Sequence, residues 1–72
     1  MATKFDGLEL KVARIRAKIR QMELAGAAGM GASTLSLIEN GLREARPEEV
    51  QRITQALKAR GVDLAASYEQ GR

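Results

Sequence analysis

The 72-residue chain contains no histidine, no cysteine and no tryptophan. A metal site built on imidazole or thiolate ligands is therefore excluded. The same absences exclude a cysteine nucleophile, a histidine general base and a Ser-His-Asp triad. A disulfide framework is excluded as well. We expect no enzyme, no cofactor and no metal site, and a small binding module is the better prediction.

Long apolar runs are also missing from the sequence. No segment approaches the roughly 18 apolar residues that a membrane-spanning helix needs. The first residues, MATKFDG, lack the apolar stretch of a signal peptide. We therefore expect one soluble domain, covering residues 1–72, that resides in the cytoplasm. The net charge of +3 favours an anionic partner, although charge alone is weak evidence.

The hydrophobic fraction of 44% consists largely of alanine. A domain this small is marginal even with a good core. An alanine-rich core is thinner still, so it favours closely packed helices and a second subunit. No segment alternates with the period of a β-strand, whereas helix-period patterns recur along the chain.

These patterns predict an all-α fold, a compact bundle of four to five short helices. The first helix begins near Gly7 with Asp6 as its N-cap. Its apolar stripe consists of Leu8, Val12, Ile15 and Ile19, and Leu10, Ala13 and Ala17 widen this stripe on one side. Later helices are predicted over residues 21–28, 32–40, from Pro47 to Gly61, and 64–69. The core covers residues 8–64 and leaves a C-terminal tail, residues 65–72.

Residues 21–40 combine the features of a helix-turn-helix, two short helices joined by a tight turn. Such a motif needs a small residue where the helices cross, here Ala25. It needs a glycine where the turn requires a positive φ, here Gly29. It also needs apolar residues that seat the second helix on the core, here Leu35 and Ile38.

This segment resembles the DNA-binding domain of phage repressor/Cro-like regulators, a class that includes many antitoxins. The similarity runs from about residue 10 to residue 41, and more loosely to residue 64. It rests on Arg14, Gln21, Leu24-Ala25, Gly29, Leu35 and Ile38-Glu39-Asn40-Gly41. The resemblance implies a lambda-repressor-like domain and a structural ion pair between Arg14 and Glu39.

The resemblance also implies that the third helix enters the major groove of double-stranded DNA while the start of the second lies on the backbone. The positions expected at base edges are Ala32, Ser33, Ser36 and Leu37. The residues expected at phosphates are Gln21 and Asn40, together with Arg20 beside the groove and Arg43 and Arg46 in the loop after the third helix. The alternative for Arg43 and Arg46 is a solvated loop charge, and for Arg20 it is a solvated basic face shared with Arg16 and Lys18. Gln21 is alternatively an ordinary first-turn residue, and Ser33 and Ser36 are alternatively solvated helix residues.

The predicted reading face departs from better-known members of the family. Those members often carry Gln, Asn, Lys or Arg there, which form bidentate contacts with bases. Ala, Ser and Leu offer only a hydroxyl and a thymine-methyl contact. Either recognition is weakly specific or driven by DNA shape, or the face binds a protein. Leu37 is a thymine contact, a protein contact or an incidental exposed residue.

The main functional hypothesis is a transcriptional regulator, a repressor that binds a two-fold operator as a homodimer. Val62, Leu64 and Tyr68 are the candidates for the dimer interface, and the alternative is that they close the core of one monomer. A second hypothesis is a protein-interaction module on a helix-turn-helix scaffold, such as an antirepressor or antiactivator. A third is an antitoxin that binds both its toxin and its operator.

Overall fold

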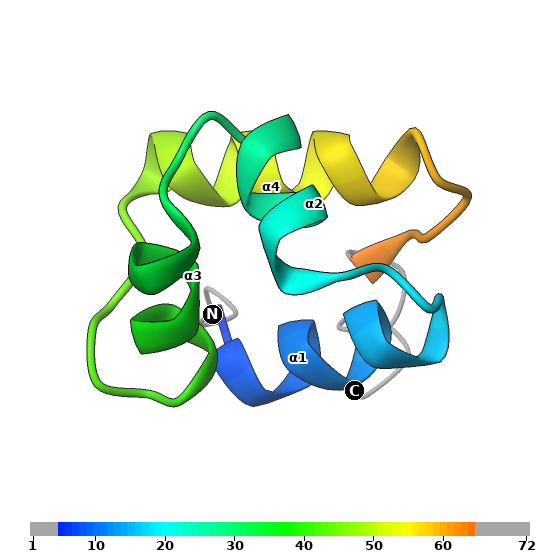
Figure 1. Ribbon diagram of the computed structural model, residues 1–72. Helices are drawn as coiled ribbons and strands as arrows, with labels where there is room; N and C mark the ends of the chain where they lie inside the picture. Colours follow the sequence, from blue (N-terminus) through cyan, green and yellow to red (C-terminus); the bar gives the residue numbers. More distant parts are fainter. Residues whose placement is uncertain (1–4, 65–72) are drawn as a thin grey trace, which may run out of the picture.

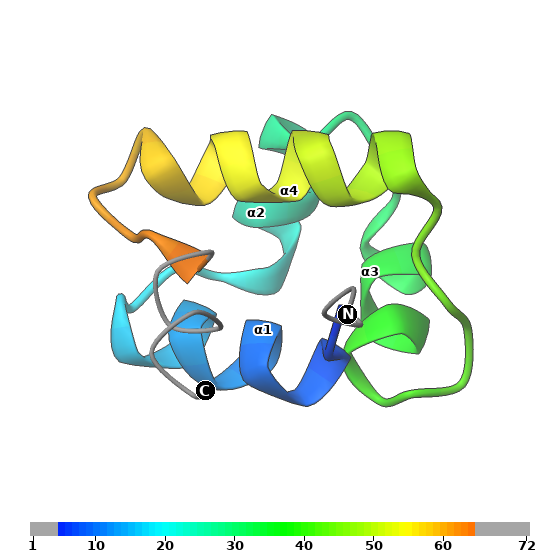
Figure 2. The same ribbon diagram turned by 180° about the vertical axis from the view of Figure 1, so that it is seen from behind.

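The computed structural model describes residues 5–64, and within this range the chain forms four helices and no strand. The helices are α1 (Gly7–Arg16), α2 (Gln21–Ala27), α3 (Ala32–Glu39) and α4 (Pro47–Lys58). Helices α1 and α4 lie on opposite sides of the molecule with α2 and α3 between them, as both views show (Figure 1 and Figure 2). Helix α2 packs against α3 and α4, and α1 packs against α3. The predicted all-α bundle is confirmed, and the helix predicted over residues 64–69 lies, apart from Leu64, outside the described residues.

The helix boundaries follow from local capping chemistry. Asp6 caps α1, because its side chain accepts a hydrogen bond of 3.0 Å from the backbone N–H of Leu8. Gly29 has a φ of 72°, and the N–H of Met30 bonds back to the carbonyl of Ala25 at 2.9 Å. This left-handed turn ends α2 and directs the chain into α3.

Helix α1 ends with the same kind of turn, but a lysine occupies the left-handed position. Lys18 has a φ of 60°. The N–H of Ile19 reaches the carbonyl of Arg14 at 3.1 Å, and the N–H of Lys18 reaches that of Ile15 at 3.0 Å. A side chain at positive φ is strained, whereas glycine is not. The α1–α2 connection is therefore held in a conformation that its sequence disfavours.

The core is formed by all four helices and by the segments that join them. Its buried hydrophobic residues are Leu10, Ile19, Leu24, Ala25, Ala28, Leu35, Ile38, Ile53, Leu57 and Leu64. The backbones of α1 and α3 approach closely at Gly7, because a Cβ placed on this residue would overlap the carbonyl of Ile38. Only glycine fits at this crossing, so Gly7 sets how closely the start of α1 approaches the end of α3.

Three of the four residues of the predicted apolar stripe, Leu8, Val12 and Ile15, face solvent, whereas the residues predicted to widen it on one side face the core. Leu8, Val12 and Ile15 are exposed, at 61%, 42% and 55%. The opposite side of the helix faces the core, where Leu10 is fully buried and smaller side chains pack beside it. Helix α1 is apolar on both sides, and its spacing alone does not say which side meets α3.

The C-terminal end of the described chain packs into the monomer. Leu64 is only 3% exposed, and Val62 is partly buried against the same core. Tyr68, the third residue of the predicted dimer interface, lies outside the described residues. Within residues 5–64, Leu64 therefore serves the monomer's own core, and its part in a dimer stays a prediction.

Candidate nucleic-acid interface

A buried carboxylate connects the helices that carry the helix-turn-helix. Glu39, the last residue of α3, is 2% exposed. It accepts hydrogen bonds from Arg14 Nε at 2.7 Å, from Arg14 Nη2 at 3.1 Å and from Gln21 Nε2 at 3.1 Å. Arg14 also donates to the carbonyl of Ile19 at 2.9 Å. One carboxylate thus fixes α1, the α1–α2 loop, the start of α2 and the end of α3 relative to one another.

The ion pair between Arg14 and Glu39 is the one that the family resemblance implies. The bond from Gln21 is an additional contact, and the sequence predicted Gln21 as a phosphate ligand instead. Its amide nitrogen is directed at Glu39, so a phosphate contact has to use the remaining donors at the start of α2. That contact stays a prediction.

The exposed side of α3 carries no charge. Among the predicted base-contacting residues, Ser33 and Leu37 are exposed, whereas Ala32 and Ser36 are half-buried. Asn40 Nδ2 donates to Ser36 Oγ in a long bond of 3.4 Å. Leu37 keeps 42% of its surface accessible. The four predicted residues therefore lie on α3, and Asn40 is its C-cap. The outward surface of this segment offers hydroxyl groups, an amide and one large apolar side chain.

Arginines occupy the N-cap positions of α2 and α4. Arg20 and Arg46 both have extended backbones, and neither side chain caps its helix. The backbone N–H of Arg20 bonds to Glu23 at 3.3 Å, and that of Arg46 bonds to Glu49 at 2.9 Å. Both arginine side chains are exposed. A cation at the positive end of a helix is unfavourable, so each arginine weakens the start of its own helix.

The two carboxylates that accept hydrogen bonds from these N-cap residues, Glu23 and Glu49, have lowered pKa values. The backbone N–H of Arg20 and the guanidinium of Arg60 lower the pKa of Glu23 below its ordinary value. The guanidinium of Arg43 and the backbone N–H of Arg46 lower the pKa of Glu49 in the same way. Both carboxylates therefore hold their negative charge under mildly acidic conditions.

Among the three arginines predicted to contact phosphates, Arg43 forms an ion pair within the protein. Its two terminal nitrogens contact both oxygens of Glu49, at 3.1 and 3.0 Å. The pair is partly buried, with 30% of the Arg43 side chain exposed. A phosphate contact by Arg43 competes with this pair, whereas Arg20 and Arg46 have no side-chain partner among residues 5–64.

Comparison with known protein families identifies the domain that these helices form. Residues 7–67 match the family model of the helix-turn-helix domain. The chain belongs to the helix-turn-helix domain family. No curated protein and no solved structure matches the chain. The match covers most of the sequence and includes α1 and α4 as well as the motif itself.

In this helix-turn-helix domain, α2 and α3 are the two helices of the motif, and α3 is the recognition helix. Proteins of this kind bind DNA by placing the recognition helix in the major groove. Within residues 5–64, no helix is long and apolar enough to cross a membrane.

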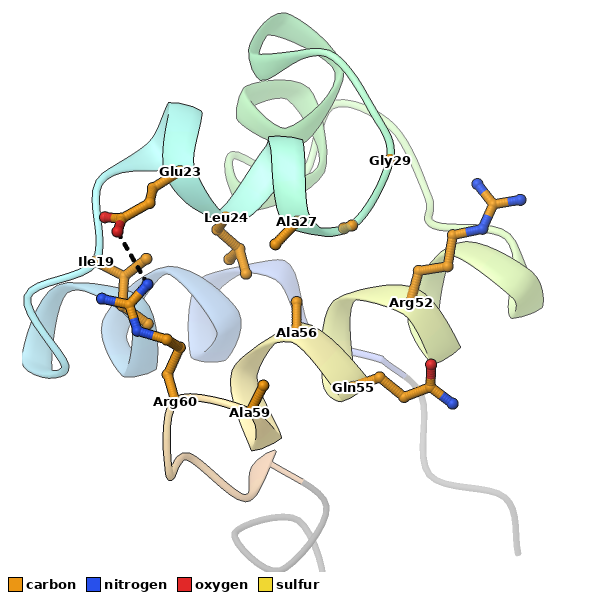
Figure 3. A pocket seen from close by; sticks show the side chains of 11 residues that line it. Ile19, Glu23, Leu24, Ala27, Gly29, Arg52, Gln55, Ala56, Ala59 and Arg60 are labelled. Atoms are coloured by element: carbon orange, nitrogen blue, oxygen red, sulfur yellow. Dashed lines mark hydrogen bonds and ion pairs between the residues drawn. The ribbon is translucent and has the colours of Figure 1, made fainter.

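A separate groove lies between α2 and α4 (Figure 3). It is lined by small side chains, among them Ala27, Ala56 and Ala59, and by the charged residues Arg52 and Arg60. Arg60 is engaged with Glu23 at 3.0 Å, the contact drawn in the figure. Neither this groove nor this ion pair is predicted by the sequence, because both join residues far apart in the chain.

Proposed function

We propose that the protein is a transcriptional regulator of the phage repressor/Cro-like type that acts in the cytoplasm. It represses by binding a two-fold operator as a homodimer, with α3 of each copy in the major groove. It acts by binding and not by catalysis. The observation that carries this proposal is the placement of two exposed arginines, Arg20 and Arg46, at the starts of α2 and α4.

The argument for phosphate contacts is electrostatic. An arginine at an N-cap costs stability in the free protein, because the helix end is already positive. When a phosphate is bound, both the helix end and the guanidinium attract the anion. The unfavourable placement of Arg20 and Arg46 is thus relieved by the DNA backbone. Ser, Thr, Asn or Asp would be the stabilising choice for folding alone.

The chemistry of α3 limits how the bases are read. Ser33 and Ser36 supply hydroxyls, and Ala32 and Leu37 supply apolar contacts suited to a thymine methyl group. None of them forms the bidentate contacts that give the strongest discrimination between bases. We therefore propose that the deformability of the operator contributes a large share of the specificity.

Nuclease footprinting on the DNA upstream of the protein's own gene tests this function. Two protected half-sites one helical turn apart are expected, with an affinity that falls steeply as salt rises. Arg20→Ala and Arg46→Ala are expected to reduce both the affinity and its salt dependence. Lys58→Ala is the matched control, since it removes one exposed charge from the end of α4 farthest from α3 (Figure 1). An affinity independent of salt would refute the proposal.

A protein-interaction module is the second candidate. It is favoured by exposed apolar side chains on and beside the motif, with Met22 and Leu42 at 75% exposure and Leu37 at 42%. If a protein partner binds here, Leu37→Ser weakens that complex, whereas Arg20→Ala and Arg46→Ala leave it nearly intact. For an operator-binding repressor, Arg20→Ala and Arg46→Ala are expected to weaken the complex with DNA, so these two variants separate the candidates.

A further inference from the structure

Helix α1 presents a second apolar face that the fold does not use. Leu8, Val12 and Ile15 lie along it at intervals of four and three residues, and 42–61% of each residue is exposed. This spacing places all three on one side of a helix. The other side, with Leu10 and Arg14, already faces the core and Glu39. The exposed side is named here the outer face of α1.

One flank of the outer face carries two side chains of opposite charge, Glu9 and Arg16. Glu9 and Arg16 lie seven residues apart, which is two turns, so they occupy the same flank. Within residues 5–64 neither side chain makes an ion pair. Both lie on the rim of a groove of about 310 Å³ that also contacts Leu8, Val12 and Leu64.

We propose that the outer face of α1 is the surface by which two copies of this chain associate, with their α1 helices antiparallel. A two-fold axis at the middle of the helix places each Glu9 against Arg16 of the second copy. The same axis places each Leu8 near Ile15 of the second copy and the two Val12 side chains against each other. Along α1, the midpoint between Glu9 and Arg16 lies within one residue of the midpoint of the apolar pairs. A single alignment of the two helices therefore brings both the ion pairs and the apolar pairs together.

A groove lies beside the outer face, on the flank that carries Glu9 and Arg16. In this register the same flank of the second copy lies over the groove, so the two ion pairs form beside it. Lys11, on the other flank, approaches Lys11 of the second copy, and this like-charge contact keeps the association weak.

Charge reversal tests the register directly, with the full-length chain and without DNA. Glu9→Arg places arginine against Arg16 of the second copy, and Arg16→Glu places two glutamates together. Each variant alone is expected to raise the dimer dissociation constant about tenfold in sedimentation equilibrium, because two pairs change sign in each dimer. Arg52→Glu, on the exposed side of α4, is the matched control and leaves the constant unchanged.

Mixing the two variants supplies the decisive measurement. In a heterodimer of the Glu9→Arg and Arg16→Glu chains, every facing pair is again one arginine and one glutamate. The mixture is therefore expected to dimerise at least as tightly as the wild type, and the double variant E9R/R16E to recover wild-type dimerisation. A wild-type chain that stays monomeric, or a mixture no tighter than either variant, overturns the proposal.

Because its partner is a second copy, this inference rests on the homodimer in the proposed function, and the two fail in different ways. A wild-type dimer that is insensitive to Glu9→Arg, Arg16→Glu and Val12→Asp overturns this surface and leaves the homodimer standing. A monomer that still protects operator DNA overturns the surface and the homodimer together but keeps DNA binding. Loss of DNA binding with a charge-sensitive dimer removes the proposed function and supports the surface.

Discussion

The arginines at the two N-caps, Arg20 and Arg46, are predicted to lower the stability of the protein and to raise its affinity for DNA. Replacing Arg20 or Arg46 with serine supplies a side-chain oxygen that caps the first turn of α2 or α4. It also removes a cation from the positive end of the helix. The protein is therefore expected to become more stable while its binding to DNA becomes weaker. A substitution that merely damaged the fold would lower both quantities.

The magnitude follows from the two effects at each site. A good N-cap contributes about 1 kcal/mol over a residue that does not cap, and removal of the cation adds about 0.5 kcal/mol. We expect about 1 kcal/mol or slightly more for each site, since Glu23 and Glu49 lose part of their favourable interaction with the arginine charge. In a domain of this size, each kcal/mol raises Tm by roughly 4–8 °C.

Thermal unfolding and salt-dependent binding are the two assays. In a dimer each substitution removes two phosphate contacts, so the slope of log K against log salt should decrease by about 1.8 for each site. Arg52→Ser, at an exposed position in the middle of α4, is the control. This substitution should lower the stability slightly and leave the slope unchanged. Increased stability with an unchanged slope would refute the phosphate contacts, and decreased stability would refute the capping argument.

Three further substitutions or conditions test the fold. Arg14→Ala leaves the buried Glu39 without two of its three donors, so urea denaturation should show a loss of about 3–5 kcal/mol; a loss below 1 kcal/mol would contradict the importance of the pair. Lys18→Gly removes the strain of a left-handed lysine and should stabilise by about 1 kcal/mol in the same assay. The pKa values of Glu23 and Glu49 are lower in the folded protein than their ordinary value of 4.5, so the charged carboxylates stabilise the fold at pH values above 4.5. The stability of the protein should therefore decrease as the pH falls below 4.5, and this decrease should be smaller in Glu49→Gln.

The sequence predicts the helices well because their ends are determined locally. Asp6, Gly29 and Pro47 act on residues within one turn, and the predicted starts of the four helices agree with the structure. Which side of α1 is buried is not a local property. Burying Leu8, Val12 and Ile15 would turn the other side of the helix, with its arginine, away from the carboxylate at the end of α3. The buried ion pair, which joins residues 25 positions apart, therefore determines the rotation of α1.

The candidate site is predictable to a smaller extent. The motif follows from its residues and the ion pair from the resemblance, and the position of the recognition helix follows from the motif. The hydrogen bond of Gln21 to Glu39 and the ion pair of Arg43 with Glu49 depend on the path of the chain. No local sequence pattern predicts these two contacts. The carboxylate partners of the N-caps do have a local signal, because Glu23 and Glu49 lie three residues after Arg20 and Arg46, at the usual position of a capping box.

The thin core explains why a polar network has so large a role in this domain. Large apolar side chains usually fix how helices are oriented, but α1 contributes only one fully buried leucine, Leu10. Three hydrogen bonds to Glu39 provide the missing constraint, and hydrogen bonds impose a direction that apolar contacts do not. Because Gln21 opens α2 and Glu39 closes α3, the same bonds set the geometry of the two helices of the helix-turn-helix. Loss of Arg14 should therefore weaken DNA binding even at temperatures where the variant is still folded.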